Sequence, residues 1–79
     1  MYTVYIIKSI NSNKYYIGCS SDFERRLMEH NNAQNISTKK DRPWKVIYIE
    51  KFDNQSEAYA REKKIKSYKG GNAFKKLIS

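Results

Sequence analysis

Residues 2–20, YTVYIIKSINSNKYYIGCS, decide the fold of this chain. Residues 2–7 are mostly β-branched or aromatic, with apolar side chains at both parities, which is typical of a strand covered on both faces. Residues 11–14, NSNK, favour a turn through side-chain to backbone hydrogen bonds, and residues 15–17, YYI, resume the strand pattern. The stretch therefore predicts a β-hairpin that ends at Gly18, with its first strand central in a sheet.

A helix is expected directly after this hairpin. Ser21 and Glu24 have the spacing of a capping box, so the helix should start near Asp22. Within it, Arg26 falls on the edge of a core-facing stripe, so we expect its guanidinium to point toward the sheet. The stripe itself is formed by Phe23, Leu27 and His30.

A basic loop is predicted from residue 31 to residue 42, because this segment is polar with few apolar side chains. Lys39, Lys40 and Arg42 give the loop its positive charge. We expect it to contact phosphates.

The remainder of the chain predicts a third strand and two more helices. Residues 44–52, WKVIYIEKF, alternate as a strand does, and Ser56 is expected to cap the next helix. Gly70 and Gly71 should close that helix, and residues 72–78 form a short final one. The inward stripe of the longer helix comprises Ala58, Glu62, Ile65 and Lys69, and the final helix packs Phe74, Leu77 and Ile78. The other core assignments are Phe23, Leu27, Trp44 and Val46.

Charge and composition indicate the class of partner. The chain has 79 residues and a formal net charge of +8, which favours nucleic acid, although lysines that only keep the surface soluble are the simpler alternative. The single cysteine, Cys19, cannot form an internal disulfide, and no apolar run approaches the roughly 20 residues needed to cross a bilayer. We therefore expect a cytoplasmic protein with no membrane segment, and the oligomeric state stays open.

Arg26 and Glu62 draw attention because both lie on core-facing stripes of different helices, with a tyrosine-rich hairpin earlier in the chain. An inward arginine or glutamate is more often half of a structural ion pair. In a basic protein, however, such groups match the needs of phosphodiester cleavage, namely an activated water, a cation for the developing charge and a hard metal ion.

The order of several short motifs resembles the GIY-YIG nuclease domain, in particular its small stand-alone bacterial members. The motifs are TVY at 3–5, YIG at 16–18, FERR at 23–26, HN at 30–31, AYARE at 58–62 and IK at 65–66. The resemblance covers nearly the whole chain. It implies a single domain over residues 1–79 with an α+β fold, in which helices flank a small three-stranded antiparallel sheet.

The resemblance also implies roles for five residues in a hydrolytic endonuclease. Tyr5 would be the general base for the attacking water, provided that nearby metal and arginine charge favours its phenolate, and Tyr16 would hold the water or the phosphate. Arg26 would contact the scissile phosphate. Glu62 would bind Mg²⁺ or Mn²⁺. His30 would orient Tyr5 or contact the phosphate, with a packed structural histidine as the alternative.

Two positions depart from the family pattern, because Thr3 replaces the first motif's glycine and Cys19 stands where some members carry lysine. The expected substrate is DNA rather than RNA, in a repair or recombination context. A non-catalytic DNA- or RNA-binding module with the same basic surface is the rival interpretation, and a protein-interaction module is a third. The predicted nucleic-acid contacts are Lys39, Lys40, Arg42, Lys63, Lys66 and Asn72, with Lys64 and Lys75 added for the binding module.

Overall fold

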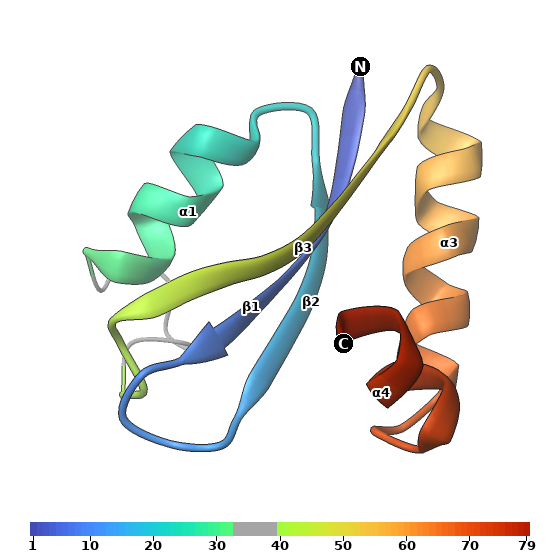
Figure 1. Cartoon of the computed structure of the whole chain (residues 1–79). Helices are drawn as coiled ribbons and strands as arrows, with labels where there is room; N and C mark the ends of the chain where they lie inside the picture. The colour runs from blue at the N-terminus through green and yellow to red at the C-terminus, as the bar shows by residue number, and fades with distance from the viewer. Residues whose placement is uncertain (33–39) are drawn as a thin grey trace.

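Among the described residues, one helix lies on one side of a small sheet and two helices lie on the other (Figure 1). The computed structural model describes residues 1–32 and 40–79. The sheet is antiparallel with strand order β2-β1-β3, so the predicted α+β fold with a three-stranded sheet is confirmed. In chain order the elements are β1 (Tyr2–Ser9), β2 (Tyr15–Ser20), α1 (Phe23–Asn31), β3 (Trp44–Phe52), α3 (Gln55–Ser67) and α4 (Asn72–Ile78).

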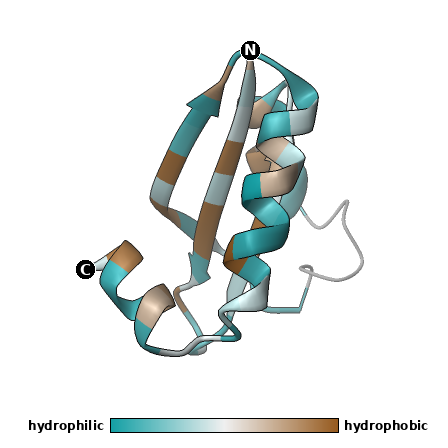
Figure 2. Cartoon of the chain, turned by 90° about the vertical axis from the view of Figure 1, so that its right-hand side faces the viewer, coloured by the Kyte–Doolittle hydropathy of each residue, from teal (hydrophilic) through white to brown (hydrophobic). Residues whose placement is uncertain are grey.

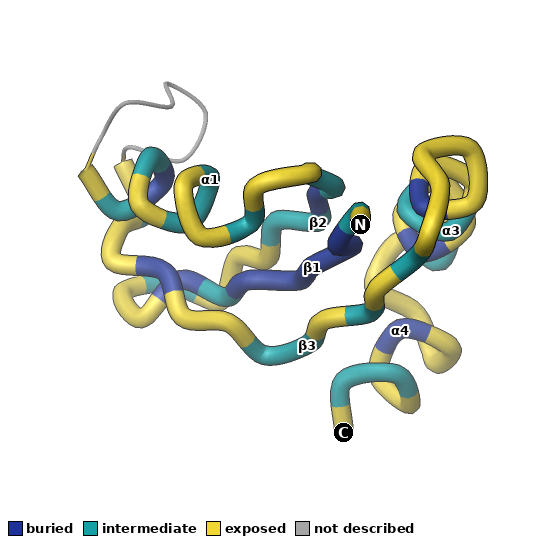
Figure 3. The backbone as a smooth tube through the Cα atoms, turned by 90° about the horizontal axis from the view of Figure 1, so that it is seen from above, coloured by how far each residue is buried: buried dark blue, intermediate teal, exposed yellow. Residues whose placement is uncertain are grey.

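Strand β1 is the centre of the molecule, as its apolar run predicts. Residues 4–7 have no exposed surface, and Figure 3 shows this buried stretch between the outer strands. Alternate side chains belong to two separate cores. The core on the α3 and α4 side contains Val4, Ile6, Ala58, Ile65 and Phe74, and the core on the α1 side contains Tyr5, Ile7 and Trp44.

A β-bulge in β3 changes which face its side chains occupy. Ile6 pairs with Tyr48 whereas Ile7 pairs with Val46, so Ile47 is the extra residue. Tyr48 therefore packs against the α3 and α4 core, while Trp44 packs on the α1 side. Val46 is 37% exposed, so its assignment to the core is wrong. The α1 layer covers this part of β3 only partly.

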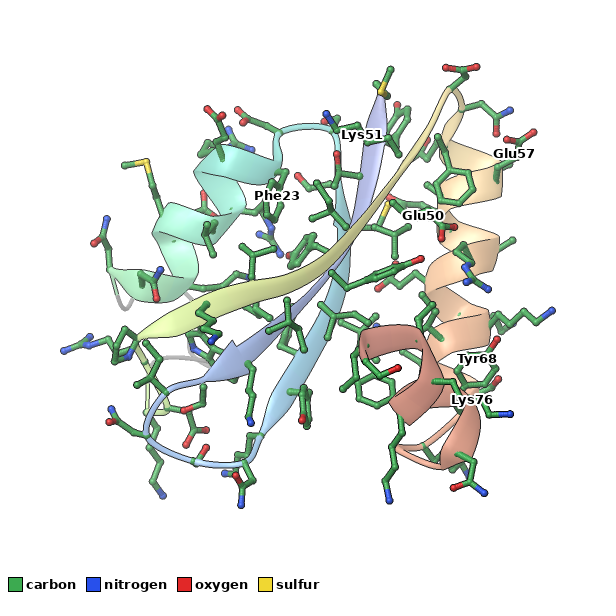
Figure 4. All side chains as sticks on the ribbon, viewed as in Figure 1. Phe23, Glu50, Lys51, Glu57, Tyr68 and Lys76 are labelled. Atoms are coloured by element: carbon green, nitrogen blue, oxygen red, sulfur yellow. The ribbon has the colours of Figure 1, made fainter. Side chains whose placement is uncertain are left out.

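Helix α3 is fixed to the sheet by packing and by an ion pair. Arg61 Nε of α3 lies 3.0 Å from Glu50 Oε1 of β3, and Figure 4 shows Glu50 turned toward the helix. The Tyr48 hydroxyl donates to the other oxygen of the same carboxylate. In Figure 2, which views the molecule from the α3 side, the outward surface of this helix is mostly hydrophilic. None of the described helices is long and apolar enough to span a membrane.

The predicted helix starts are correct to within two residues, but both predicted caps are wrong. Asp22 caps α1 by accepting a hydrogen bond from the Arg25 N–H at 3.2 Å, so Ser21 does not form the expected capping box. Asn54 caps α3 by accepting from the Glu57 N–H at 2.8 Å, which places Ser56 inside the helix. In each segment a neighbouring Asp or Asn already satisfies the free N–H group.

Gly18 does not end the hairpin, whereas Gly70 has the left-handed conformation expected after the helix. β2 continues through Gly18 to Ser20, so the prediction that the hairpin ends at Gly18 is wrong. α3 ends at Ser67, and the left-handed turn that follows uses Lys69 at φ 50° and Gly70 at φ 74°. Lys69 therefore lies outside the helix and is not part of its inward stripe. The final helix has the predicted bounds and buries Phe74.

Candidate active site

Tyr5 occupies the middle of β1, on the α1 side of the sheet. Its partner across the hairpin is Gly18, and a Cβ added to Gly18 would lie 2.5 Å from the Tyr5 hydroxyl oxygen. The phenol thus lies over the one position of β2 that has no side chain. This close approach explains why the YIG motif needs glycine at this point.

Three more rings surround the phenol. The Tyr16 ring centroid lies 6.4 Å from that of Tyr5 and 4.6 Å from that of His30. Phe23 of α1, which Figure 4 shows turned toward the sheet, lies 5.1 Å from Tyr5 between centroids. The structure therefore brings together Tyr5, Tyr16 and His30, which the sequence places 25 residues apart at the extremes.

The Tyr5 hydroxyl and His30 form a buried hydrogen bond. Tyr5 Oη lies 3.2 Å from His30 Nε2, and neither residue has exposed surface. Burial raises the pKa of Tyr5 to about 12, although its hydrogen bond to the Arg26 guanidinium opposes the shift. Burial lowers the pKa of His30, and the charge of Arg26 lowers it further. At neutral pH the pair is therefore a neutral phenol beside a neutral imidazole, because burial outweighs the arginine charge.

Arg26 is the accessible cation of this cluster. Its guanidinium points toward the sheet as predicted, and its hydrogen bond with Tyr5 raises the pKa of Arg26. Its Nη1 also lies 3.2 Å from Glu29 Oε1, one turn along α1, and its side chain is 35% exposed. The sequence interpretation missed Glu29, although the i, i+3 spacing to Arg26 signals such a pair.

Asn31 holds α1 in position over the sheet. Its side-chain oxygen accepts a hydrogen bond from the Trp44 N–H at 2.6 Å, and its amide donates to the Trp44 carbonyl at 3.3 Å. These two bonds join the last residue of α1 to the first residue of β3. Arg26 and His30 depend on this attachment, because α1 carries both.

Glu62 approaches the cluster from α3. Burial is the largest cause of the raised pKa of Tyr5 and of the raised pKa of the Cys19 thiol on β2, and the charge of Glu62 adds to both shifts. Its carboxylate is 19% exposed, and Oε2 lies 2.8 Å from Lys66 Nζ. Lys66, predicted as a nucleic-acid contact, therefore has its ammonium engaged with Glu62 in this structure.

The protein groups near Glu62 suit Mg²⁺, which keeps several water ligands, better than a metal ion whose ligands all come from the protein. No group of three or more His, Cys, Asp or Glu able to hold a metal occurs within residues 1–32 and 40–79. Mg²⁺ commonly uses one or two carboxylates and fills its shell with water and substrate phosphates. One partly buried carboxylate, such as Glu62, meets that requirement if Lys66 moves aside.

Every predicted nucleic-acid contact that the structure describes is exposed. Lys40, Arg42 and Lys63 are exposed, and Lys39 lies outside the described residues. Asn72 is the exposed first residue of α4, whose N-cap is Gly71, so Asn72 does not cap this helix.

Comparison with known proteins identifies the family to which the chain belongs. A family model described as the GIY-YIG catalytic domain matches residues 1–75, so the chain belongs to the GIY-YIG family. This is a family of nuclease domains, whose substrate class is nucleic acid and whose members generally use divalent metals.

Relatives of similar size support this assignment. A UPF0213 protein of Staphylococcus saprophyticus is 41% identical over 77 residues, which cover 96% of this chain and 92% of the relative. A UPF0213 protein of Listeria welshimeri is 41% identical over 75 residues, covering 94% and 82% of the two chains. A UPF0213 protein of Haloquadratum walsbyi is 38% identical over 66 residues, covering 82% and 73%. No solved structure gave a significant match.

Proposed function

We propose that this chain is a metal-dependent endonuclease that hydrolyses phosphodiester bonds of DNA. The observation that carries the proposal is the contact of Tyr5 with both His30 and Arg26, within reach of the Glu62 charge. These groups supply a proton route, a cation for phosphate and a carboxylate for a metal ion, which together are the requirements of phosphoryl transfer to water.

Arg26 is proposed to bind the scissile phosphate. A guanidinium offers several N–H donors in one plane and stabilises charge on phosphate oxygens better than an ammonium does. In the free protein its donors are shared between Tyr5 and Glu29. A bound phosphate competes with both partners and draws the guanidinium outward. That movement gives solvent access to the phenol of Tyr5, which is otherwise fully buried.

Tyr5 and His30 are proposed to relay a proton away from the attacking water. With a pKa of about 12, the phenol is a poor base by itself at neutral pH. As the attacking water gives a proton to the Tyr5 oxygen, the phenol passes its own proton to His30 Nε2, which lies 3.2 Å away, so no free phenolate has to form. The P–O bond to the water oxygen forms as the P–O bond to the leaving ester oxygen breaks, and the leaving oxygen takes up a proton from solvent water. Tyr16, whose ring lies close to both groups, holds the water or the phosphate.

Glu62 is proposed to hold Mg²⁺ or Mn²⁺. When bound, the ion polarises the phosphate and neutralises charge on its oxygens. Lys66 shields the carboxylate in the free protein, so binding of the ion has to displace the 2.8 Å ion pair. We therefore expect weak metal affinity without substrate.

The wider setting completes the proposal. The single domain over residues 1–79 is proposed to act in the cytoplasm, in DNA repair or recombination, and to be selective for DNA structure. Phosphates outside the site are proposed to bind the basic surface, and the net charge of +8 supports this part of the proposal. The contacts proposed are Lys39, Lys40, Arg42, Lys63, Lys66 and Asn72.

A non-catalytic nucleic-acid-binding module is the second candidate. The observation in its favour is that both charged groups of the cluster already have protein partners, Arg26 with Glu29 and Glu62 with Lys66. Such pairs are also common in purely structural roles. The two candidates differ in whether bound nucleic acid is cut.

Cleavage of labelled single-stranded, duplex, flapped and branched DNA, and of matching RNA, in Mg²⁺, Mn²⁺ or EDTA separates the two candidates. We expect metal-dependent cutting that falls at least about 100-fold in Arg26→Ala and Glu62→Gln. Arg25→Ala is the control for charge on α1, because Arg25 is 68% exposed. Glu57→Gln is the control on α3, because Glu57 is exposed.

The reverse pattern identifies the binding module. Folded wild type that binds these substrates and cuts none of them, in either metal, overturns the endonuclease proposal. Cutting that survives in both Arg26→Ala and Glu62→Gln overturns the residue assignment instead.

A further inference from the structure

A hollow of about 250 Å³ lies at the end of the β1–β2 hairpin, apart from the tyrosine cluster. It is lined by Lys8, Ser9, Ile10, Ser12, Asn13 and Lys45. None of Tyr5, Tyr16, Arg26 or His30 takes part in its lining. The hairpin turn forms one wall, and the start of β3 contributes Lys45.

Two of the lining residues, Lys8 and Lys45, are lysines. Lys8 and Lys45 are direct partners in the antiparallel pairing of β1 with β3, so their side chains leave the same face of the sheet. Directly opposite residues have Cβ atoms about 4.5–5.5 Å apart, and like charges at that spacing are destabilising. The chain therefore tolerates a local repulsion at this position.

Within the described residues, the Asp41 carboxylate lies beside the hollow, because its Oδ1 accepts a hydrogen bond at 3.4 Å from the hydroxyl of Ser12, a lining residue. Neither Lys8 nor Lys45 forms an ion pair there, and Asp41, the nearby acid of the hairpin end, is 3.4 Å from Lys14 Nζ instead. Lys8 gains only a weak compensation from the Tyr15 ring, whose centroid lies 5.7 Å from Nζ. An unbalanced pair of ammonium groups in a concave site is suited to bind an anion.

The walls of the hollow are fixed before any ligand arrives. Ser9 is a buried residue with 2% of its surface exposed. Its hydroxyl donates a hydrogen bond to the Asp41 carbonyl at 2.6 Å. The same oxygen accepts hydrogen bonds from the N–H groups of Asn11 and Ser12 at 3.1 Å each. Ser12 Oγ in turn accepts from the Lys14 N–H at 3.3 Å. The side chain of Asn13 lines the hollow beside them and carries further N–H donors.

We propose that this hollow binds a backbone phosphate of the nucleic acid, at a position other than the bond that is cut. The inference rests on the proposed function for its ligand, because a polynucleotide supplies such phosphates at regular intervals. Lysine ammonium groups bind a phosphodiester as point charges and read no base identity. The site therefore adds affinity and fixes the path of the strand without adding sequence preference.

Binding of a fluorescent oligonucleotide, measured in EDTA so that no cutting occurs, tests the proposal. We expect the double variant Lys8→Gln/Lys45→Gln to bind at least about 10-fold more weakly at fixed salt. Its plot of log affinity against log salt should be shallower by about 0.7, since about 0.7 is lost for each phosphate contact with a single strand and the hollow binds one phosphate. The matched control, Lys51→Gln/Lys76→Gln, removes the same charge from two exposed lysines and should change affinity less than 3-fold.

A second arm identifies the source of the phosphate. In an NMR titration with inorganic phosphate alone, the backbone amide resonances of Ser12 and Asn13 should shift and reach saturation in wild type. In the double variant these shifts should be absent. If these shifts occur but both double variants bind the oligonucleotide equally, the hollow is a free-anion site and the proposal is overturned. Absence of shifts together with equal oligonucleotide binding overturns it as well.

These outcomes are independent of catalysis. The double variant should keep or raise the melting temperature, because the change removes a like-charge pair. Failure of the cleavage assay under the proposed function leaves the binding result intact, since all binding is measured without metal.

Discussion

Tyr5 has the most constrained side chain of the site. Its ring lies over Gly18, its hydroxyl meets His30, and the guanidinium of Arg26 contacts it from α1. A tyrosine in a strand usually packs with its hydroxyl in water, and only this set of contacts separates Tyr5 from that ordinary role.

Gly18→Ala should displace the Tyr5 ring. The new Cβ would lie 2.5 Å from the hydroxyl oxygen and 2.6 Å from Cζ, so the phenol must move away from His30. We expect a loss of about 1–3 kcal/mol in the free energy of unfolding, measured with urea, together with a loss of cleavage. Ser21→Ala, an exposed change beside α1, is the control. Unchanged stability would mean that the ring does not lie where the structure places it.

The raised pKa of Tyr5 predicts a specific loss of stability in alkali. The folded-state pKa is about 12 and the ordinary value is 10.0, so above pH 10 the unfolded chain loses this proton first. The stabilising effect is full below pH 10 and disappears as the pH rises toward 12, by on the order of 2–3 kcal/mol. Urea unfolding at pH 9–12 should show this loss in wild type and a smaller one in Tyr5→Phe. Identical pH profiles would contradict the burial of an un-ionised phenol.

At the scale of elements, the two helices that carry the site are attached in different ways. α1 has nine residues and is held at its end by the Asn31 bonds to Trp44, whereas α3 has thirteen and packs Ala58 and Ile65 into the core. The shorter helix carries Arg26 and His30, and the longer one carries Glu62. The site therefore depends on both attachments being kept.

The cap of α3 can be tested with two neighbouring substitutions. Asn54→Ala removes the acceptor of the Glu57 N–H and should cost about 1 kcal/mol in unfolding free energy. Ser56→Ala lies inside the same helix and is exposed, so it should change stability by no more than about 0.5 kcal/mol. Thermal unfolding followed by circular dichroism measures both. The opposite order of effects would restore Ser56 as the cap.

At the scale of the whole molecule, the net charge of +8 is the dominant property. Several basic groups form ion pairs, among them Arg61 with Glu50 and Lys66 with Glu62. The positive charge still exceeds the negative charge, because the chain has 16 Lys and Arg but only 8 Asp and Glu. Such an excess attracts a polyanion from a distance and makes binding sensitive to salt.

Nucleic-acid affinity should therefore fall steeply with ionic strength. For about four phosphate contacts, the association constant of a DNA duplex should drop on the order of 100-fold between 50 and 200 mM salt. Fluorescence anisotropy in EDTA measures this slope for the whole chain. Binding that is flat over this range would indicate that the lysines serve solubility alone.

The sequence by itself determined the features that depend on local pattern. The apolar run of residues 2–7 specified a central strand, the 11–14 segment specified the turn, and the helical periods placed Arg26 and Glu62 on inward stripes. Such signals can be read because strand and helix periods are properties of neighbouring residues. Local pattern did not determine which residue caps each helix, since adjacent Ser, Asp and Asn residues compete for the same N–H groups.

Only the tertiary structure decided what lies beside what. The pairing of Tyr5 with Gly18, the bulge that exposes Val46 and the paired lysines Lys8 and Lys45 all follow from strand register. Register is set by packing between distant segments, and a shift of one residue moves every side chain to the other face. The physical reason is that local pattern fixes the direction of a side chain within its element, whereas its neighbours are fixed by long-range pairing.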